Sequence, residues 1–129
     1  MRTLRVGIAS YEEMKARTLA IAGGKHRPGP AEPTIWFSSA ESFARILSDR
    51  NRGLLRVIAE STPQSLAELA GLTGRKKSNL SRTLKTMERY GFVRLSRGAR
   101  GSIIPRVPYQ RISLTLPLSN PERVGNEAA

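Results

Sequence analysis

The residues with the clearest chemical meaning are basic, and they are concentrated in one part of the chain. Between Arg75 and Arg111 lie eleven lysine and arginine residues and one acidic residue, Glu88. The net charge of the whole chain is +12, and the eleven basic and nine acidic residues elsewhere nearly cancel. Charge of one sign opposes folding by self-repulsion, and its usual compensation is a polyanionic partner, most often nucleic acid. The alternative is a solvated basic surface that serves only solubility.

Residues suited to catalysis or metal binding are scarce. The chain has no cysteine, and its one histidine, His26, lies in a proline-rich loop without a carboxylate pattern around it. Ser65 is explained as a helix cap by Glu68 three residues later, and no Gly-Lys-Ser/Thr follows the glycines near Arg100. We therefore expect no enzymatic activity, no catalytic residues, no metal and no cofactor.

The length and composition indicate a folded protein away from membranes. The chain has 129 residues, of which 39% are hydrophobic and 25% are charged, which fits one domain with a modest core. No apolar run approaches the ~18 residues needed to span a bilayer, and the N-terminus lacks a signal-type apolar region. We expect a cytoplasmic location and no membrane partner.

The first part of the chain predicts a strand, a helix and a second strand. "TLRVGIA" alternates apolar and other residues, as in a half-buried strand. Ser10 and Glu13 form a capping box that predicts a helix over 11–22, which Gly23 and Gly24 end. A proline-rich loop follows, and "TIWF" predicts a short strand, with Trp36 and Phe37 in the core or at an interface.

The next part predicts four helices. Ser38 and Glu41 form a second capping box, "SDRNRGLLRVIAE" predicts the next helix, and Ser65 with Glu68 starts a short third one. The longest of these helices is predicted over about 76–90, without a good N-cap side chain, and Gly91 ends it.

Strands dominate the last part of the chain. "FVRLS" and "SIIPRV" predict a hairpin around the glycine-containing turn "RGARG", and "RISLTL" predicts a further half-buried strand. "SNPERVGNEAA" predicts a loose tail. The predicted fold class is therefore α+β.

The helix over 76–90 has two faces of opposite character. At 100° per residue, Leu80, Leu84 and Met87 share a buried stripe. A basic stripe interleaved with small polar residues lies opposite. Such a face suits the DNA major groove, because Arg and Lys reach phosphates or guanine, and Asn and Ser bond base edges. The predicted recognition residues are Arg75, Lys76, Lys77, Ser78, Asn79, Ser81, Arg82, Lys85 and Arg89.

The short helix before this one completes a helix-turn-helix, in which Leu69, Leu72 and Leu80 are expected to share a core. The hairpin then forms a wing whose glycines allow close approach to a phosphate or a narrow minor groove. The predicted wing residues are Arg94, Arg97 and Arg100. These patterns predict a winged helix-turn-helix that binds double-stranded DNA.

Residues 44–104 resemble the winged-helix regulators of the ArsR and MarR type. The resemblance rests on "ILSDRNRGLLRVIAE" and on "SLAELAGLTGRKKSNLSRTLKTMERYGFVRLSRG", which is similar to their recognition unit. It implies sequence-specific duplex binding, usually as a dimer, with recognition roles for Ser78, Asn79, Ser81 and Arg82. The corresponding wing roles fall to Arg97 and Arg100.

The N-terminal part is less typical of those regulators and more closely resembles a group of small DNA-binding proteins of archaea and bacteria that are often encoded beside a toxin-like protein. The stretch that carries this likeness is "SYEEMKARTLAIAGGKHRPGPAEPTIWFSS". It implies an antitoxin that represses its own operon, with a cognate toxin as partner.

These predictions divide the chain into three parts. Residues 1–37 form a strand-helix-strand extension for a dimer or partner, 38–118 a winged helix-turn-helix able to fold alone, and 119–129 the tail. We expect a homodimer, because one recognition helix reads few base pairs. The spare strands "TLRVGIA" and "RISLTL" and the apolar "TIWF" are candidate dimer surfaces. An RNA-binding protein with the same basic surface is the alternative function, although base stacking would need exposed aromatic residues that the basic region scarcely offers.

Overall fold

The structure, a computed structural model, describes residues 2–118. Its helices are α1 (Tyr11–Ala22), α2 (Ala40–Ile46), α3 (Asp49–Ser61), α4 (Leu66–Thr73) and α5 (Lys77–Arg89), with a 3-10 turn at Ala99–Gly101. Its strands are β1 (Thr3–Ile8), β2 (Ile35–Phe37), β3 (Arg94–Arg97), β4 (Ile103–Arg106) and β5 (Arg111–Thr115). The fold is α+β, as the sequence predicts. The predicted loose tail, 119–129, lies outside the described residues.

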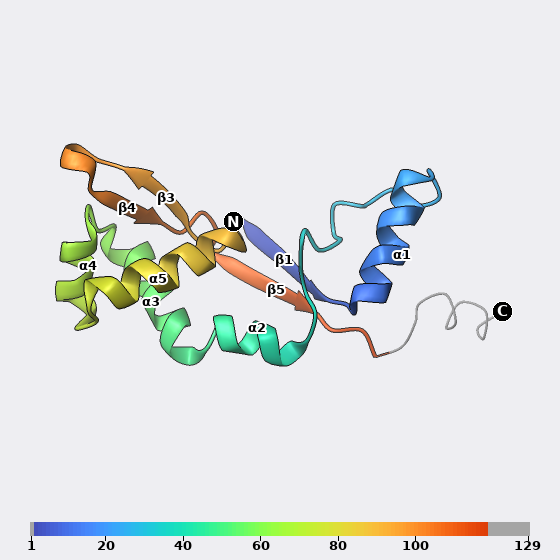
Figure 1. The fold of residues 1–129 in the computed structure, drawn as a ribbon, viewed down its shortest axis with the longest axis horizontal. Coiled ribbons are helices and arrows are strands. Elements are labelled where there is room, and N and C mark those ends of the chain that lie inside the picture. The colour runs from blue at the N-terminus through green and yellow to red at the C-terminus, as the bar shows by residue number, and fades with distance from the viewer. Residues whose placement is uncertain (1, 119–129) are drawn as a thin grey trace.

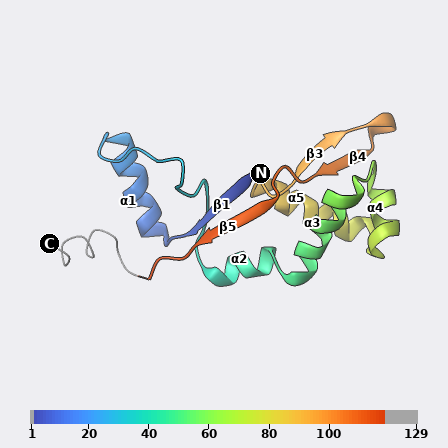
Figure 2. The same ribbon diagram turned by 180° about the vertical axis from the view of Figure 1, so that it is seen from behind.

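The elements are arranged along an elongated body (Figure 1). One end holds α3, α4, α5 and the β3–β4 hairpin, the middle holds the sheet of β1, β2 and β5, and α1 projects at the other end. In Figure 2, the view from behind, α3 lies in front of the paler α5. No helix within residues 2–118 is long and apolar enough to cross a membrane.

The middle sheet places β1, the first strand of the chain, beside β5, the last strand of the described residues. Its strand order is β2-β1-β5, and both neighbours of β1 run parallel to it. Thr3 pairs with Arg111 and Val6 with Leu114. β1 and β5, predicted as spare strands for a dimer, are therefore each other's partners within one chain, with β1 central and β5 at the edge of the sheet; their role in a dimer stays a prediction.

The core crosses the boundary predicted after residue 37. Leu4, Val6 and Phe37 belong to the same buried cluster as Leu54 of α3 and Phe92 after α5. The ring of Phe37 stacks on Tyr90, with centroids 4.6 Å apart and an interplanar angle of 18°. β1 and β2 thus supply one wall of the core against which the later helices pack, while α1 buries no residue.

Local signals set most helix starts. Ser10 and Glu13 form the predicted capping box of α1. The cap of α2 is Ser39, which accepts from the Ser42 amide, so the predicted box of Ser38 and Glu41 was wrong by one residue. Ser65 caps α4 as expected, but the Glu68 carboxylate accepts from the Gln64 amide, one residue before the cap.

Packing of α4 on α5 follows part of the predicted pattern. Leu69, Leu80, Leu84 and Met87 are fully buried, which confirms the apolar stripe of α5. Leu72, however, is 50% exposed and takes no part in the shared core. α4 is only eight residues long, and Leu72 lies about 60° from Leu69 around the axis of the last helical turn before Gly74, beyond the strip that α5 covers.

Candidate nucleic-acid interface

α5 exposes the basic face that the sequence predicts. Lys76 occupies the N-cap position without a side-chain capping bond, as expected from the absence of a good cap. Most predicted recognition residues are exposed, and Ser81 is half-buried on the flank of the helix. The exposed ones are Lys76, Lys77, Ser78, Arg82, Lys85 and Arg89.

Two predicted recognition residues are turned toward the protein instead. The Arg75 guanidinium donates through Nε to Asn79 Oδ1 at 2.9 Å, and through its two amino groups to Asn51 Oδ1 at 3.3 Å and Thr83 Oγ1 at 3.4 Å. Burial lowers the pKa of Arg75 below its usual value, and the nearby positive charge of Arg50 lowers it further. Arg75 and Asn79 therefore join α5 to α3, which sequence reasoning missed because Asn51 lies on a different helix.

The β3–β4 hairpin lies beside α5. Gly91, with φ of 83°, adopts the left-handed backbone that ends α5 and turns the chain toward β3. Glu88, the acidic residue of this region, accepts from the Leu95 amide at 3.3 Å and so holds β3 to α5. The Glu88 carboxylate is thus engaged in a contact between α5 and β3.

The hairpin tip is tightly built. A Cβ atom on Gly98 would lie 2.5 Å from Ile104 Cδ1, so a larger residue there would require the Ile104 side chain to shift. Arg100 has a left-handed backbone, with φ of 59°, which is strained for a residue with a side chain. Such strain is concentrated at functional sites. The three predicted wing arginines, Arg94, Arg97 and Arg100, are all exposed, and Arg97 Nη1 donates to the Gly101 carbonyl at 3.3 Å.

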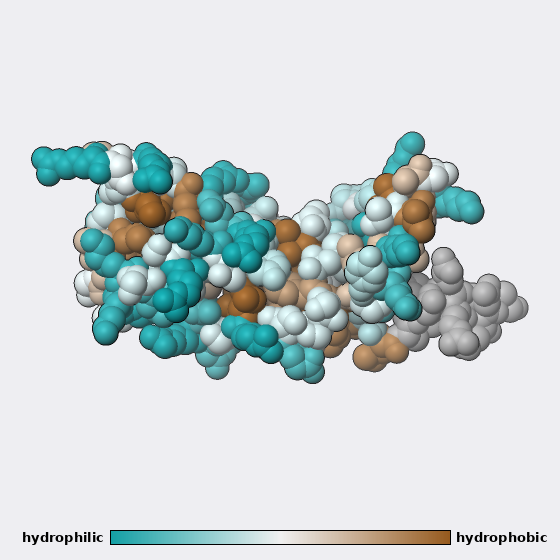
Figure 3. Space-filling model, viewed as in Figure 1, coloured by the Kyte–Doolittle hydropathy of each residue, from teal (hydrophilic) through white to brown (hydrophobic). Residues whose placement is uncertain are grey.

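No carboxylate among residues 2–118 forms an ion pair with this basic surface. Within residues 2–118, the ion pairs are Arg17–Glu32, His26–Glu32 and Arg52–Asp49, none of which involves α5 or the hairpin. Hydrophilic side chains gather over α5, and one projects from the hairpin tip (Figure 3). The arrangement is suited to binding a polyanion that contacts both elements.

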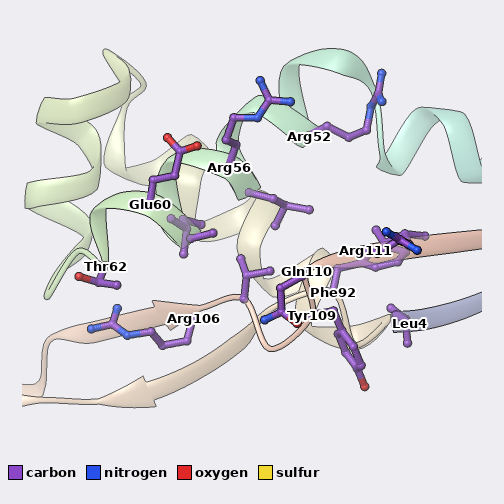
Figure 4. A pocket seen from close by; sticks show the side chains of 15 residues that line it. Leu4, Arg52, Arg56, Glu60, Thr62, Phe92, Arg106, Tyr109, Gln110 and Arg111 are labelled. Carbon is purple, nitrogen blue, oxygen red and sulfur yellow. The ribbon is translucent and has the colours of Figure 1, made fainter. Parts of the chain in front are cut away.

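One basic residue of the region has a structural role that the sequence did not indicate. Arg106 of β4 donates through Nη1 to the Pro63 carbonyl at 2.7 Å and thereby ties the hairpin to the α3–α4 connection. Figure 4 shows Arg106 extending along β4 toward Thr62. Arg106 also borders an open cavity of about 620 Å³ between α3 and the β4–β5 connection, with Leu4 and Phe92 among its apolar lining. Its lining comes from distant segments, so no local motif could predict it.

The described residues thus define an α+β protein with a positively charged helix and hairpin on one face. The profile of the family designated HVO_A0114 matches residues 46–114, and the chain belongs to that family. Comparisons with curated proteins and with solved structures returned no significant match.

Proposed function

We propose that the protein is a sequence-specific regulator of transcription that binds double-stranded DNA. In this proposal α3, α4 and α5 form a helix-turn-helix, α5 enters the major groove, and β3–β4 is the wing. The resemblance of residues 44–104 to MarR- and ArsR-type regulators points the same way. We expect the protein to repress transcription, as an antitoxin that represses its own operon would.

The observation that carries the proposal is the exposed positive charge of α5. Arg82, Lys85 and Arg89 are exposed along one face of a helix whose other face is fully buried, and no carboxylate among residues 2–118 is paired with them. A helix presenting such a face has the width and chemistry of a major-groove reader. Asn79 offers a base edge only its amide N–H donors, because its carbonyl oxygen accepts from Arg75.

The aromatic residues of the basic region, Tyr90, Phe92 and Tyr109, argue against RNA as the partner. Base stacking on exposed rings is the usual means of reading single-stranded RNA. Tyr90 stacks on Phe37, and Phe92 is buried with it. Tyr109 lies under the Arg2 guanidinium, 5.2 Å from the ring centroid. These rings are engaged within the protein.

The test is a competition for the protein between labelled duplex DNA and unlabelled competitors. Duplexes selected from a random pool supply the operator, and competitors are that operator, a random duplex and single-stranded RNA of equal length. We expect the operator to compete best and the RNA worst. Displacement by RNA at lower concentrations than by duplex would contradict the proposal.

A protein partner at the α1 end is a second part of the proposal. α1 buries no residue, and Tyr11 and Leu19 are 79% and 63% exposed. Exposed apolar side chains on a projecting helix suit a protein interface. A homodimer and a cognate toxin are the two proposed partners. Light scattering of the pure protein tests the first, and co-purification with the product of the neighbouring gene tests the second.

A further inference from the structure

A notch lies on the side of α5 that faces α2 and α3. It has a volume of about 160 Å³ and is bordered by the end of α2, the start of α3 and one flank of α5. Its lining residues are Arg45, Ile46, Asn51, Arg82, Thr83, Thr86 and Met87. Three separate elements therefore converge on a small open hollow, lined by apolar and polar side chains, beside the proposed recognition face.

The neutral polar groups of this notch are already engaged. Asn51 donates through Nδ2 to the Ile46 carbonyl at 3.0 Å and accepts from Arg75. The Thr86 hydroxyl donates to the Arg82 carbonyl at 3.2 Å, and the Thr83 hydroxyl accepts from Arg75. The groups left to bind a ligand are the guanidinium groups of Arg45 and Arg82, which have no hydrogen bond or ion pair with any side chain in residues 2–118.

Further positive charge stands behind the notch. Arg75 donates to Asn51 and Thr83, two of the residues that line the notch, and the nearby charge of Arg50 contributes to lowering the pKa of Arg75. No carboxylate of residues 2–118 lines the notch. Like charges held this close destabilise the site, and an anion seated among them would relieve the repulsion.

We propose that this notch binds a phosphate of the DNA backbone, on the opposite side of α5 from the β3–β4 hairpin. The inference rests on the proposed function and extends it to a site at which Arg45 contacts the phosphate, beside the base-reading Arg82 that also borders the notch. In Figure 1 the hairpin lies above α5, and the corner between α2 and α3 lies below it. A duplex that receives α5 in its major groove presents phosphates along both walls of that groove. The hairpin then contacts one wall and the notch the other.

Single substitutions test the site. Arg45→Ala and Arg45→Gln each remove an exposed guanidinium that lines the notch, and Arg56→Ala is the matched control, because Arg56 is an exposed arginine of α3 that lines the cavity facing β5 instead. We expect each notch variant to bind operator and random duplex roughly tenfold more weakly, as for a lost hydrogen bond to a charged group. The magnitude of the slope of log affinity against log salt should fall by about one unit. The control should leave both quantities unchanged.

Ethylation of individual DNA phosphates distinguishes a direct phosphate contact by Arg45 from a purely structural role of that residue. With the parent protein, ethylation of one phosphate on the wall opposite the hairpin should block binding, and with Arg45→Ala that interference should disappear. If the notch variants bind like Arg56→Ala while the parent binds duplex with a steep salt slope, the notch is not a phosphate site although the proposed function stands. If the parent binds no duplex, the proposed function and the notch site both fail.

Discussion

Arg75 illustrates how one residue's role is decided by partners outside its own segment. Its sequence context, next to two lysines at the start of a basic helix, predicts a DNA contact. Its three hydrogen bonds, to Asn51, Asn79 and Thr83, instead make it a link between α3 and α5. The side chain therefore acts on recognition by holding α5 in position.

Replacing Arg75 should consequently affect stability first. We expect Arg75→Ala to lower the free energy of unfolding by roughly 1–3 kcal/mol, because Asn51 and Asn79 lose a charged donor in a half-buried site. The matched control is Lys77→Ala, an exposed neighbour whose effect should stay within about 0.5 kcal/mol. Urea unfolding measures both. Unchanged stability of Arg75→Ala, together with weakened DNA binding, would restore the role that the sequence predicts.

Glu32 gives a pH-dependent prediction at the other end of the molecule. Hydrogen bonds from His26 at 3.0 Å and Arg17 at 2.8 Å lower the pKa of Glu32 from 4.5 to about 2. A lowered folded-state pKa means that the ionised carboxylate stabilises the fold above about pH 4.5, and that this contribution is lost as the pH falls through 2. The carboxyl carbon of Glu32, followed by NMR, should titrate near pH 2 in the parent and higher in His26→Ala. A parent midpoint already near 4.5 would show that the pairing is absent in solution.

At the scale of elements, the helices were predictable where their signals are local. The Ser10 and Glu13 box, the buried stripe of α5 and the turn at Gly91 each depend on residues within a few positions of one another. The predicted cap of α2 was wrong by one residue because Ser38 and Ser39 are adjacent candidates, and only Ser39 accepts from the Ser42 amide. The orientation of Leu72 and of Arg75 depends on how helices pack, which local patterns do not specify.

The start of α5 has a positive charge where a capping side chain would stabilise the helix. Its N-cap position holds Lys76, which makes no capping bond and adds positive charge at the end of a helix where negative charge is favourable. We expect Lys76→Ser to raise the free energy of unfolding by roughly 1 kcal/mol relative to Lys76→Ala, since serine accepts from a free backbone N–H. Both variants should lose the same amount of DNA affinity through the missing charge. Equal stability of the two variants in urea unfolding would contradict this account of the helix start.

At the scale of the whole molecule, the pairing of β1 with β5 was beyond prediction. The alternation of apolar and polar residues identified both strands. Thr3 and Arg111, however, become neighbours only when the helices and strands between β1 and β5 have packed together. The sheet places Leu4 and Val6 against the helices, so the N-terminal residues complete the core that the sequence assigned to residues 38–118 alone.

Deleting residues 1–37 should therefore abolish cooperative unfolding, because β5 would lose the strand it pairs with and Leu54 and Phe92 would lose one wall of their core. Single substitutions refine the test. Leu4→Ala should cost about 2–5 kcal/mol, as for other buried leucines. Leu19→Ala, on the exposed face of α1, should cost less than about 0.5 kcal/mol. A deletion variant that unfolds cooperatively would show that residues 38–118 fold as an independent domain after all.

The central claim is that α5 and the β3–β4 hairpin together contact one DNA duplex. The most direct measurement is affinity against salt concentration, for operator and random duplex, with the parent, Arg82→Ala and Arg97→Ala; both side chains are exposed, so stability should be retained. Arg82→Ala should lose about 1–3 kcal/mol on the operator and relax the preference at one base position. Arg97→Ala should weaken both duplexes equally and lower the magnitude of the salt slope by about one unit. If neither substitution weakens binding, this basic surface is not the DNA-binding face, and the account is contradicted.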